Sequence, residues 1–79
     1  MTYVLEPIYA PARGKVQWKR SHGEKVGPGE LLGVVIGRDG ERWGIRSPAI
    51  GTLLILPKGI WEVGAGETIA YLELASIVV

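Results

Sequence analysis

The chain matches itself when it is displaced by 37 residues, and this internal repeat constrains the fold more than any other feature of the sequence. Residues 8–36 correspond in this way to residues 45–73. The identities fall in two blocks: Ile8-Tyr-Ala-Pro-Ala-Arg-Gly14 aligns with Ile45-Arg-Ser-Pro-Ala-Ile-Gly51, and Val26-Gly-Pro-Gly-Glu30 aligns with Val63-Gly-Ala-Gly-Glu67. Two separate blocks in one register indicate a duplicated unit.

Each copy of the repeat has the pattern of β-structure. Five short apolar stretches bounded by glycine or proline predict strands, at Lys15–Trp18, Leu31–Ile36, Trp43–Ile45, Thr52–Leu56 and Thr68–Leu74. Pro11 and Pro48 are each expected to open a strand, where the loss of an N–H group costs least. No long stretch has helical periodicity without Gly or Pro. We therefore predict an all-β fold in which two units share one core across a pseudo-twofold axis.

Length and composition narrow the class of protein. A chain of 79 residues is expected to form one small domain, residues 1–79, with little room for a deep catalytic cleft. The absence of Cys excludes disulfides, thiolate metal sites and cysteine nucleophiles. A net charge of +1 does not favour a polyanionic partner, and the apolar runs are too short to span a membrane. The N-terminus lacks the pattern of a signal peptide, so the expected location is the cytoplasm.

The two copies meet at an Asp-Gly pair, Asp39-Gly40, in the predicted hairpin tip 38–41. Asp-Gly between strand-like flanks predicts a tight type I′ turn, because both residues tolerate positive φ. The repeat places this turn at the centre of the pseudo-symmetry, with both chain ends expected together at the opposite end. A protruding tip of this kind is well suited to contact a partner.

The chain resembles the biotinyl/lipoyl carrier domains over Ile8–Leu74. The family pattern Gly-acidic-x-Val-x-x-Gly-x-x-Leu is complete at Gly23–Leu32, and the Ala-Pro and Ser-Pro segments that precede Gly14 and Gly51 also match. The resemblance implies a barrel-sandwich hybrid, a flattened β-barrel of two quasi-symmetric four-stranded sheets. It also implies that the hairpin tip is where relatives carry their chemistry.

In those relatives a lysine at the tip, within Asp-Lys-Ala or Met-Lys-Met, carries a lipoyl or biotinyl group. The lysine lies eleven residues before the Gly that follows the second-half Pro, which here corresponds to Gly40, with Asp39 beside it. No Lys occurs between Lys25 and Lys58, and the guanidinium groups of nearby arginines are not acyl acceptors. We therefore expect no attached group and no cofactor.

Other candidate residues do not combine into a catalytic or metal site. His22 is the only histidine, and the carboxylates show no spacing typical of an acid–base pair, so we expect no enzyme activity and no metal. His22 is expected to be an exposed turn residue. The basic stretch Arg13–Lys25 contains Trp18 and could contact nucleic acid, but its alternation of polar and apolar residues favours a strand with one solvated face.

The possible partner contact is the hairpin, comprising Arg38, Asp39, Gly40, Glu41, Arg42 and Trp43. The three tryptophans are expected mainly in the core, with one near the hairpin as an alternative contact residue. The expected function is a non-catalytic docking or structural module with a protein partner. The alternative is a carrier protein of an acyl- or carboxyl-transfer complex whose attachment lysine is replaced. A homodimer through the terminal segments Met1–Glu6 and Ser76–Val79 is also possible.

Overall fold

The computed structural model describes residues 2–57 and 62–76. These residues form eight β-strands and no helix: β1 (Thr2–Tyr9), β2 (Gly14–Trp18), β3 (Lys25–Val26), β4 (Leu31–Ile36), β5 (Arg42–Arg46), β6 (Gly51–Ile55), β7 (Glu62–Val63) and β8 (Thr68–Ser76). The prediction of an all-β chain is confirmed over this part.

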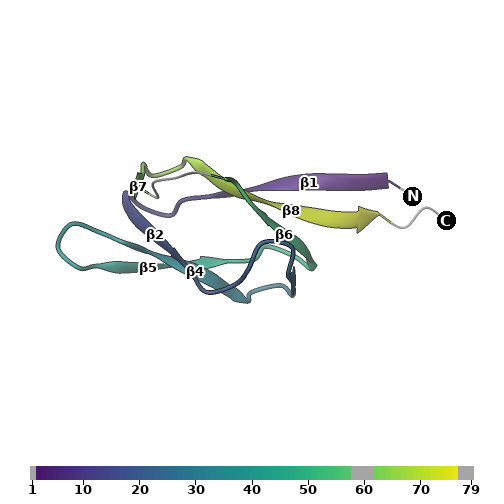
Figure 1. Cartoon of the computed structure of the whole chain (residues 1–79), viewed down its shortest axis with the longest axis horizontal. Coiled ribbons are helices and arrows are strands. Elements are labelled where there is room, and N and C mark those ends of the chain that lie inside the picture. The colour runs from purple at the N-terminus through teal and green to yellow at the C-terminus, as the bar shows by residue number, and fades with distance from the viewer. Residues whose placement is uncertain (1, 58–61, 77–79) are drawn as a thin grey trace.

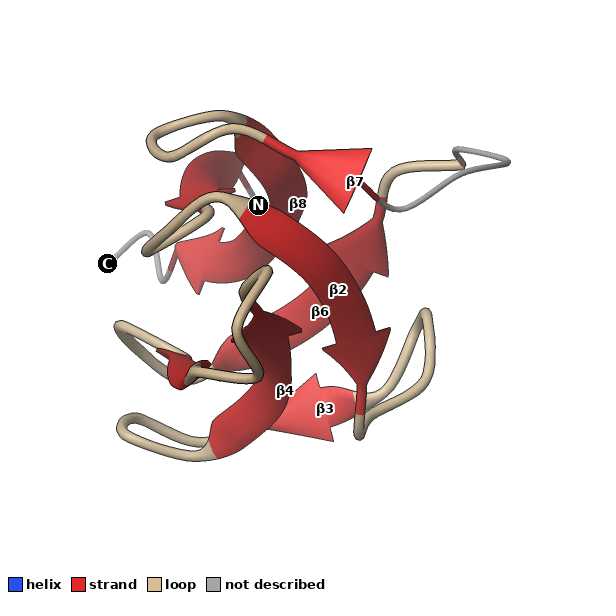
Figure 2. Cartoon of the chain, turned by 90° about the vertical axis from the view of Figure 1, so that its left-hand side faces the viewer, coloured by secondary structure: helices blue, strands red, loops and turns tan. Residues whose placement is uncertain are grey.

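The strands form two four-stranded antiparallel sheets (Figures 1 and 2). The first sheet has the order β1-β8-β6-β3, and the second has the order β5-β4-β2-β7. Displacement by 37 residues carries β2 onto β6 and β3 onto β7, and it carries β4 and β5 onto β8 and β1 with altered ends. Each sheet therefore takes two strands from each copy of the repeat, so neither copy contains a complete sheet.

The Val-Gly-x-Gly-Glu turns of the two copies have the same internal hydrogen bonds. In the first copy, Gly27 N donates to the Glu30 carboxylate over 3.2 Å. In the second copy, Gly64 N donates to the Glu67 carboxylate over 3.1 Å. The glutamate thus closes the turn by accepting from a backbone N–H that no strand partner satisfies, which explains why the motif ends in Glu in both copies.

Each of these turns is also bound to the other copy. Gly29 N in the first turn donates to the Ser47 carbonyl over 2.7 Å, and Gly66 N in the second donates to the Ala10 carbonyl over 2.9 Å. Ser47 and Ala10 are equivalent under the repeat, and each is 3% exposed. The duplication is therefore preserved down to individual backbone hydrogen bonds.

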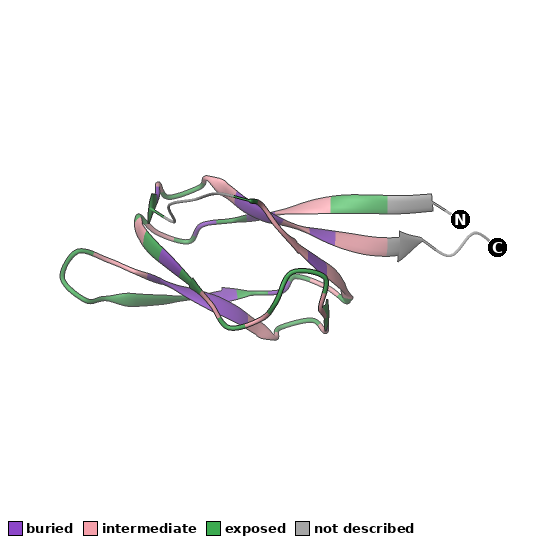
Figure 3. Cartoon of the chain, viewed as in Figure 1, coloured by how far each residue is buried: buried purple, intermediate pink, exposed green. Residues whose placement is uncertain are grey.

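The core lies between the two sheets and is built from equivalent positions (Figure 3). Val16 and Leu53 form one such pair, and Leu32 and Ile69 form another. The residues of this core are Ile8, Ala10, Val16, Val26, Leu32, Val35, Ile45, Leu53, Val63, Ile69, Ala70 and Leu72. Burying about ten such side chains is the main stabilising contribution in a fold of this size.

The strand boundaries differ from the prediction in two respects. Pro11 and Pro48 do not open strands, because each lies in a bend and the strands begin three residues later, at Gly14 and Gly51. The predicted strands correspond to β2, β4, β5, β6 and β8, whereas β1, β3 and β7 were not predicted. The predicted position of the chain ends is confirmed: β1 pairs with β8, and their outer ends lie opposite the β4–β5 hairpin (Figure 1).

Candidate functional site

The β4–β5 hairpin closes through a three-residue loop. Gly40 N donates to the Gly37 carbonyl over 3.1 Å, and Gly37 N donates to the Glu41 carbonyl over 2.8 Å. Arg38 and Asp39 are the central residues of the turn and have negative φ, whereas Gly40 has φ 85°. This is a type I turn followed by a glycine bulge. The predicted type I′ turn is wrong, because it requires positive φ at both central residues of a two-residue loop.

The tip of the hairpin is held by one of its own side chains. The Glu41 carboxylate accepts a hydrogen bond from Asp39 N over 3.1 Å. All six predicted contact residues, from Arg38 to Trp43, are exposed and lie together at this end of the molecule (Figures 1 and 3). The sequence therefore identified a continuous exposed surface, which we call the hairpin surface.

Gly40, the position at which the resemblance aligns an acceptor lysine, lies on open surface. A Cβ atom built on it would have no heavy atom within 4 Å. Its positive φ is one that residues with a side chain rarely adopt, which accounts for glycine at this position of the bulge. The turn itself supplies no amine, since its cations are the guanidinium groups of Arg38 and Arg42.

The tryptophans are not all in the core. Trp43 is 38% exposed, and its ring covers Gly37 so closely that a Cβ there would lie 2.8 Å from Cζ3. The expectation of a core position is wrong for Trp43, because its ring extends over the hairpin glycine and lines an open groove. Trp18 is partly buried against the core, as expected, and Trp61 lies outside the described residues.

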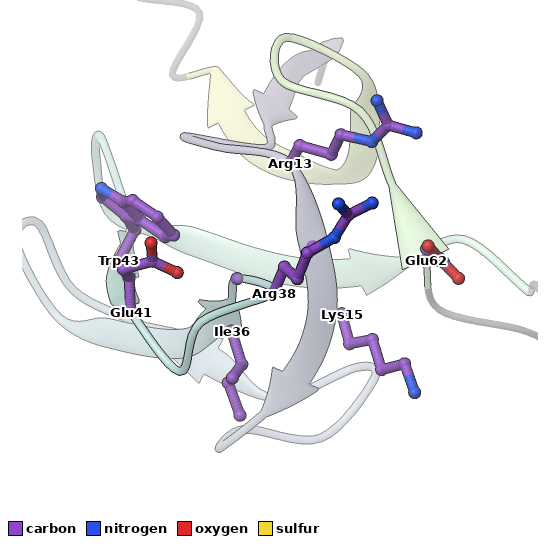
Figure 4. Close-up of a pocket in the computed structure, with 9 residues that line it drawn as sticks. Arg13, Lys15, Ile36, Arg38, Glu41, Trp43 and Glu62 are labelled. Atoms are coloured by element: carbon purple, nitrogen blue, oxygen red, sulfur yellow. The ribbon is translucent and has the colours of Figure 1, made fainter.

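A groove of about 690 Å³ adjoins the hairpin (Figure 4). Its walls come from the segment leading into β2, the end of β4, the hairpin and β7. The lining residues are Arg13, Gly14, Lys15, Ile36, Gly37, Arg38, Glu41, Trp43 and Glu62. Strand pairing explains this assembly: Lys15 lies opposite Ile36 on one side and opposite Glu62 on the other. Sequence reasoning assigned Arg13 and Lys15 to a basic stretch but did not place them beside the hairpin.

His22 is exposed, as predicted, but it also has a structural contact. Its Nδ1 atom accepts a hydrogen bond from Ile55 N over 2.9 Å. Ile55 is the last residue of β6, and 33 residues separate the two partners along the chain. The imidazole therefore satisfies the backbone at the end of a strand, a role that no local motif indicates.

The basic stretch Arg13–Lys25 is partly neutralised within the chain. Arg20 forms ion pairs with Glu24 over 2.9 Å and with Glu30 over 3.2 Å. A hydrogen bond from Ser21 N and the neighbouring Arg20 guanidinium lower the pKa of Glu24. Along β2 the predicted alternation is confirmed, with Lys15 and Gln17 exposed and Val16 buried.

Among residues 2–57 and 62–76, no group of three or more His, Asp or Glu side chains could hold a metal ion. No helix in the same part of the chain could cross a membrane. No known family model matches the chain, and no curated protein matches it.

Proposed function

We propose that the chain is an unmodified barrel-sandwich hybrid of the biotinyl/lipoyl type that acts as a non-catalytic docking or structural module. The fold supports this proposal because two four-stranded sheets, related by the internal repeat, place one hairpin alone at an end of the molecule. The hairpin surface is exposed and rich in Arg and Trp, the residue types that carry much of the energy in protein interfaces.

The observation that carries the proposal is the hairpin tip itself. The turn presents Asp39 and an open Gly40 where a carrier domain would present its acceptor lysine. An amide link to a carboxylic acid such as lipoate or biotin needs a neutral amine as nucleophile, and a guanidinium does not provide one at neutral pH. The hairpin therefore offers shape and charge to a protein partner instead of an attached group. In keeping with this function, the proposed location is the cytoplasm, with no nucleic acid and no membrane as partner.

Intact mass spectrometry tests this function against the alternative of a carrier with a relocated attachment site. The chain is co-expressed with a lipoate ligase and, separately, with a biotin ligase, and its mass is compared with the sequence mass. We expect no added mass. A lipoyl or biotinyl increment on the unaltered chain would overturn the proposal and support the alternative.

The Gly40→Lys variant is the matched control, because it restores an amine beside Asp39. Acylation of this variant by the lipoate ligase would show that the ligase was active and that the amine alone was missing. A folded but unmodified variant, with a genuine lipoyl domain labelled in the same cells, would show that the ligase also reads the shape of the tip.

A further inference from the structure

The groove beside the hairpin surface contains cations that form no close ion pair in the part of the chain that the structure describes. Arg13, Lys15 and Arg38 line it, and Figure 4 shows the guanidinium group of Arg38 beside the start of β2 and that of Arg13 extended away from the strand. Within residues 2–57 and 62–76, ion pairs shorter than 4.0 Å are formed by Arg20 with Glu24 and Glu30, and none by the groove cations.

The two carboxylates of the groove stand at its ends. Glu62 lies directly across the β2–β7 pair from Lys15, so these two opposite charges offset each other. Glu41 accepts the hydrogen bond from Asp39 N at the tip. In Figure 4 the guanidinium group of Arg38 therefore lies between the two carboxylates, and Arg13 lies to one side of this line.

The internal repeat supplies a comparison within the same molecule. Gly14 of the groove corresponds to Gly51 in the second copy, and both are required by the backbone. A Cβ on Gly14 would collide with the carbonyl oxygen of Ile36, and a Cβ on Gly51 would lie 2.6 Å from the carbonyl oxygen of Glu73, the residue equivalent to Ile36. The scaffold of the groove is thus present in both copies.

The three cations of the groove have no cationic counterpart in the second copy. Arg13 corresponds to Ile50, which is 74% exposed, and Lys15 corresponds to Thr52. Because the second copy forms the same backbone without these cations, the fold does not need them. Their presence beside the hairpin requires an explanation outside folding, and binding of an anionic group is the chemistry that guanidinium groups serve best.

We propose that this groove binds a short acidic segment of a protein partner. Side-chain carboxylates of the segment would lie on the guanidinium groups of Arg13 and Arg38, with an adjacent apolar side chain against the exposed face of Trp43. Glu41 and Glu62 at the two ends repel a longer anion, which favours a short stretch of Asp or Glu over a nucleic-acid backbone. The inference rests on the proposed docking function and names the chemistry of its partner.

Backbone amide NMR of the full chain tests the inference. The probe is an end-capped Gly-Glu-Glu-Leu-Gly peptide at low ionic strength, with the uncharged Gly-Gln-Gln-Leu-Gly peptide as its control. We expect shift changes at residues 13–15 and 37–43 with the acidic peptide only. We also expect the affinity to fall as salt is added, because exposed charge pairs are screened.

The decisive variant combines Arg13→Ile with Arg38→Ala, which introduces the residues found at the equivalent positions 50 and 75. We expect the Kd for the acidic peptide to rise about tenfold or more, since two charge-assisted contacts are lost. Lys25→Ala, on β3 in the other sheet, removes one exposed cation elsewhere and should leave the Kd unchanged. Arg38→Gln alone, at an exposed turn position, gives a second measurement if the double variant fails to fold.

Three outcomes would overturn the inference. They are the absence of amide shift changes in the groove, a loss of affinity in Lys25→Ala as large as that in the double variant, and tighter binding of a thymidine oligonucleotide than of the acidic peptide. These outcomes differ from failure of the docking function itself. If the chain stays unmodified by the ligases but does not bind the acidic peptide, the proposed docking function stands and only the acidic partner is excluded.

Discussion

Gly14 lies directly against the carbonyl oxygen of Ile36, so closely that no side chain can be placed between β2 and β4 at this point. The same relationship joins Gly51 to Glu73 in the second copy. The first contact sets how closely β2 and β4 approach at the floor of the groove, and the second sets how closely β6 and β8 approach in the other sheet. They also explain why glycine stands at this position in both copies of the repeat.

Gly14→Ala should therefore be among the most destabilising single substitutions in the chain. The added methyl must displace backbone, and overpacking of this kind costs about 3 kcal/mol or more of unfolding free energy. Urea denaturation followed by tryptophan fluorescence measures the effect. Gly64→Ala is the control, because a Cβ there meets nothing within 4 Å and its φ is not positive. Equal losses in the two variants would contradict the close approach.

Gly40→Ala and Gly40→Lys should destabilise the chain by similar amounts. Both introduce a Cβ at φ 85° without any steric contact, so both carry a backbone strain of about 1 kcal/mol. The same denaturation experiment measures the two variants in parallel. A much larger loss for Lys than for Ala would show that the tip is more crowded than the open position described above.

His22→Ala should lower the unfolding free energy by about 0.5–1 kcal/mol, because Ile55 N loses its acceptor at an exposed site. His22→Asn should recover part of the loss, since its side-chain oxygen can accept from the same N–H. Hydrogen exchange of the Ile55 amide gives a direct readout. Unchanged exchange in His22→Ala would contradict the contact.

Glu24 should contribute to the loss of stability in acid. Its pKa in the folded chain lies below the ordinary value of 4.5, so the unfolded chain binds the proton more tightly. The contribution is therefore present above pH 4.5 and is lost as the pH falls through the folded pKa. The melting temperature measured across this range should fall less steeply for Glu24→Gln than for the unaltered chain.

Arg20→Met should also make the melting temperature fall less steeply in acid, because it removes the cation that helps to keep the pKa of Glu24 low. The hydrogen bond from Ser21 N remains in this variant, so the flattening should be smaller than for Glu24→Gln. Identical acid profiles for all three proteins would contradict the prediction.

A homodimer through the terminal strands can be tested at Val4. β1 pairs with β8 along one side and stands at the edge of the first sheet, where Val4 is 49% exposed and Leu5 is 53% exposed. If a second copy adds to this edge, Val4→Lys should convert the dimer to a monomer, because an edge charge opposes strand pairing. Tyr9→Lys, beyond Pro7 on the same strand, should leave it intact. Sedimentation equilibrium measures the mass in solution of each protein. If the unaltered chain is a monomer at about 0.5 mM, the dimer is excluded.

The internal repeat accounts for how much of the fold was predictable. Val16 and Leu53, or Leu32 and Ile69, are apolar at equivalent positions, and they occupy equivalent places in the core. The two-residue strands β3 and β7 were not predictable, because Val26 and Val63 are single buried residues next to turns and show no periodicity. β1 was missed because Glu6 and Pro7 interrupt its apolar pattern, which is acceptable only at a sheet edge.

The sequence predicted only the part of the candidate site whose residues are consecutive in the chain. The residues from Arg38 to Trp43 follow one another in the chain, so their exposure could be inferred from the turn. Arg13 and Glu62 reach the same groove through strand pairings that join distant segments, and no spacing in the sequence reveals those pairings. For Trp43 the sequence left a core position and an exposed contact open, and the exposed alternative holds because its ring covers Gly37 at the hairpin and not the core.

The antiparallel pairing of β1 with β8 brings Thr2 opposite Ser76 at one end of a molecule whose longest dimension is 49 Å. A chain that enters along β1 leaves along β8, beside the point of entry. Such a unit can be spliced into a surface loop of a host protein without separating the host's two flanking ends. The hairpin surface would then lie at the far end of the unit, at a fixed distance from the surface of the host.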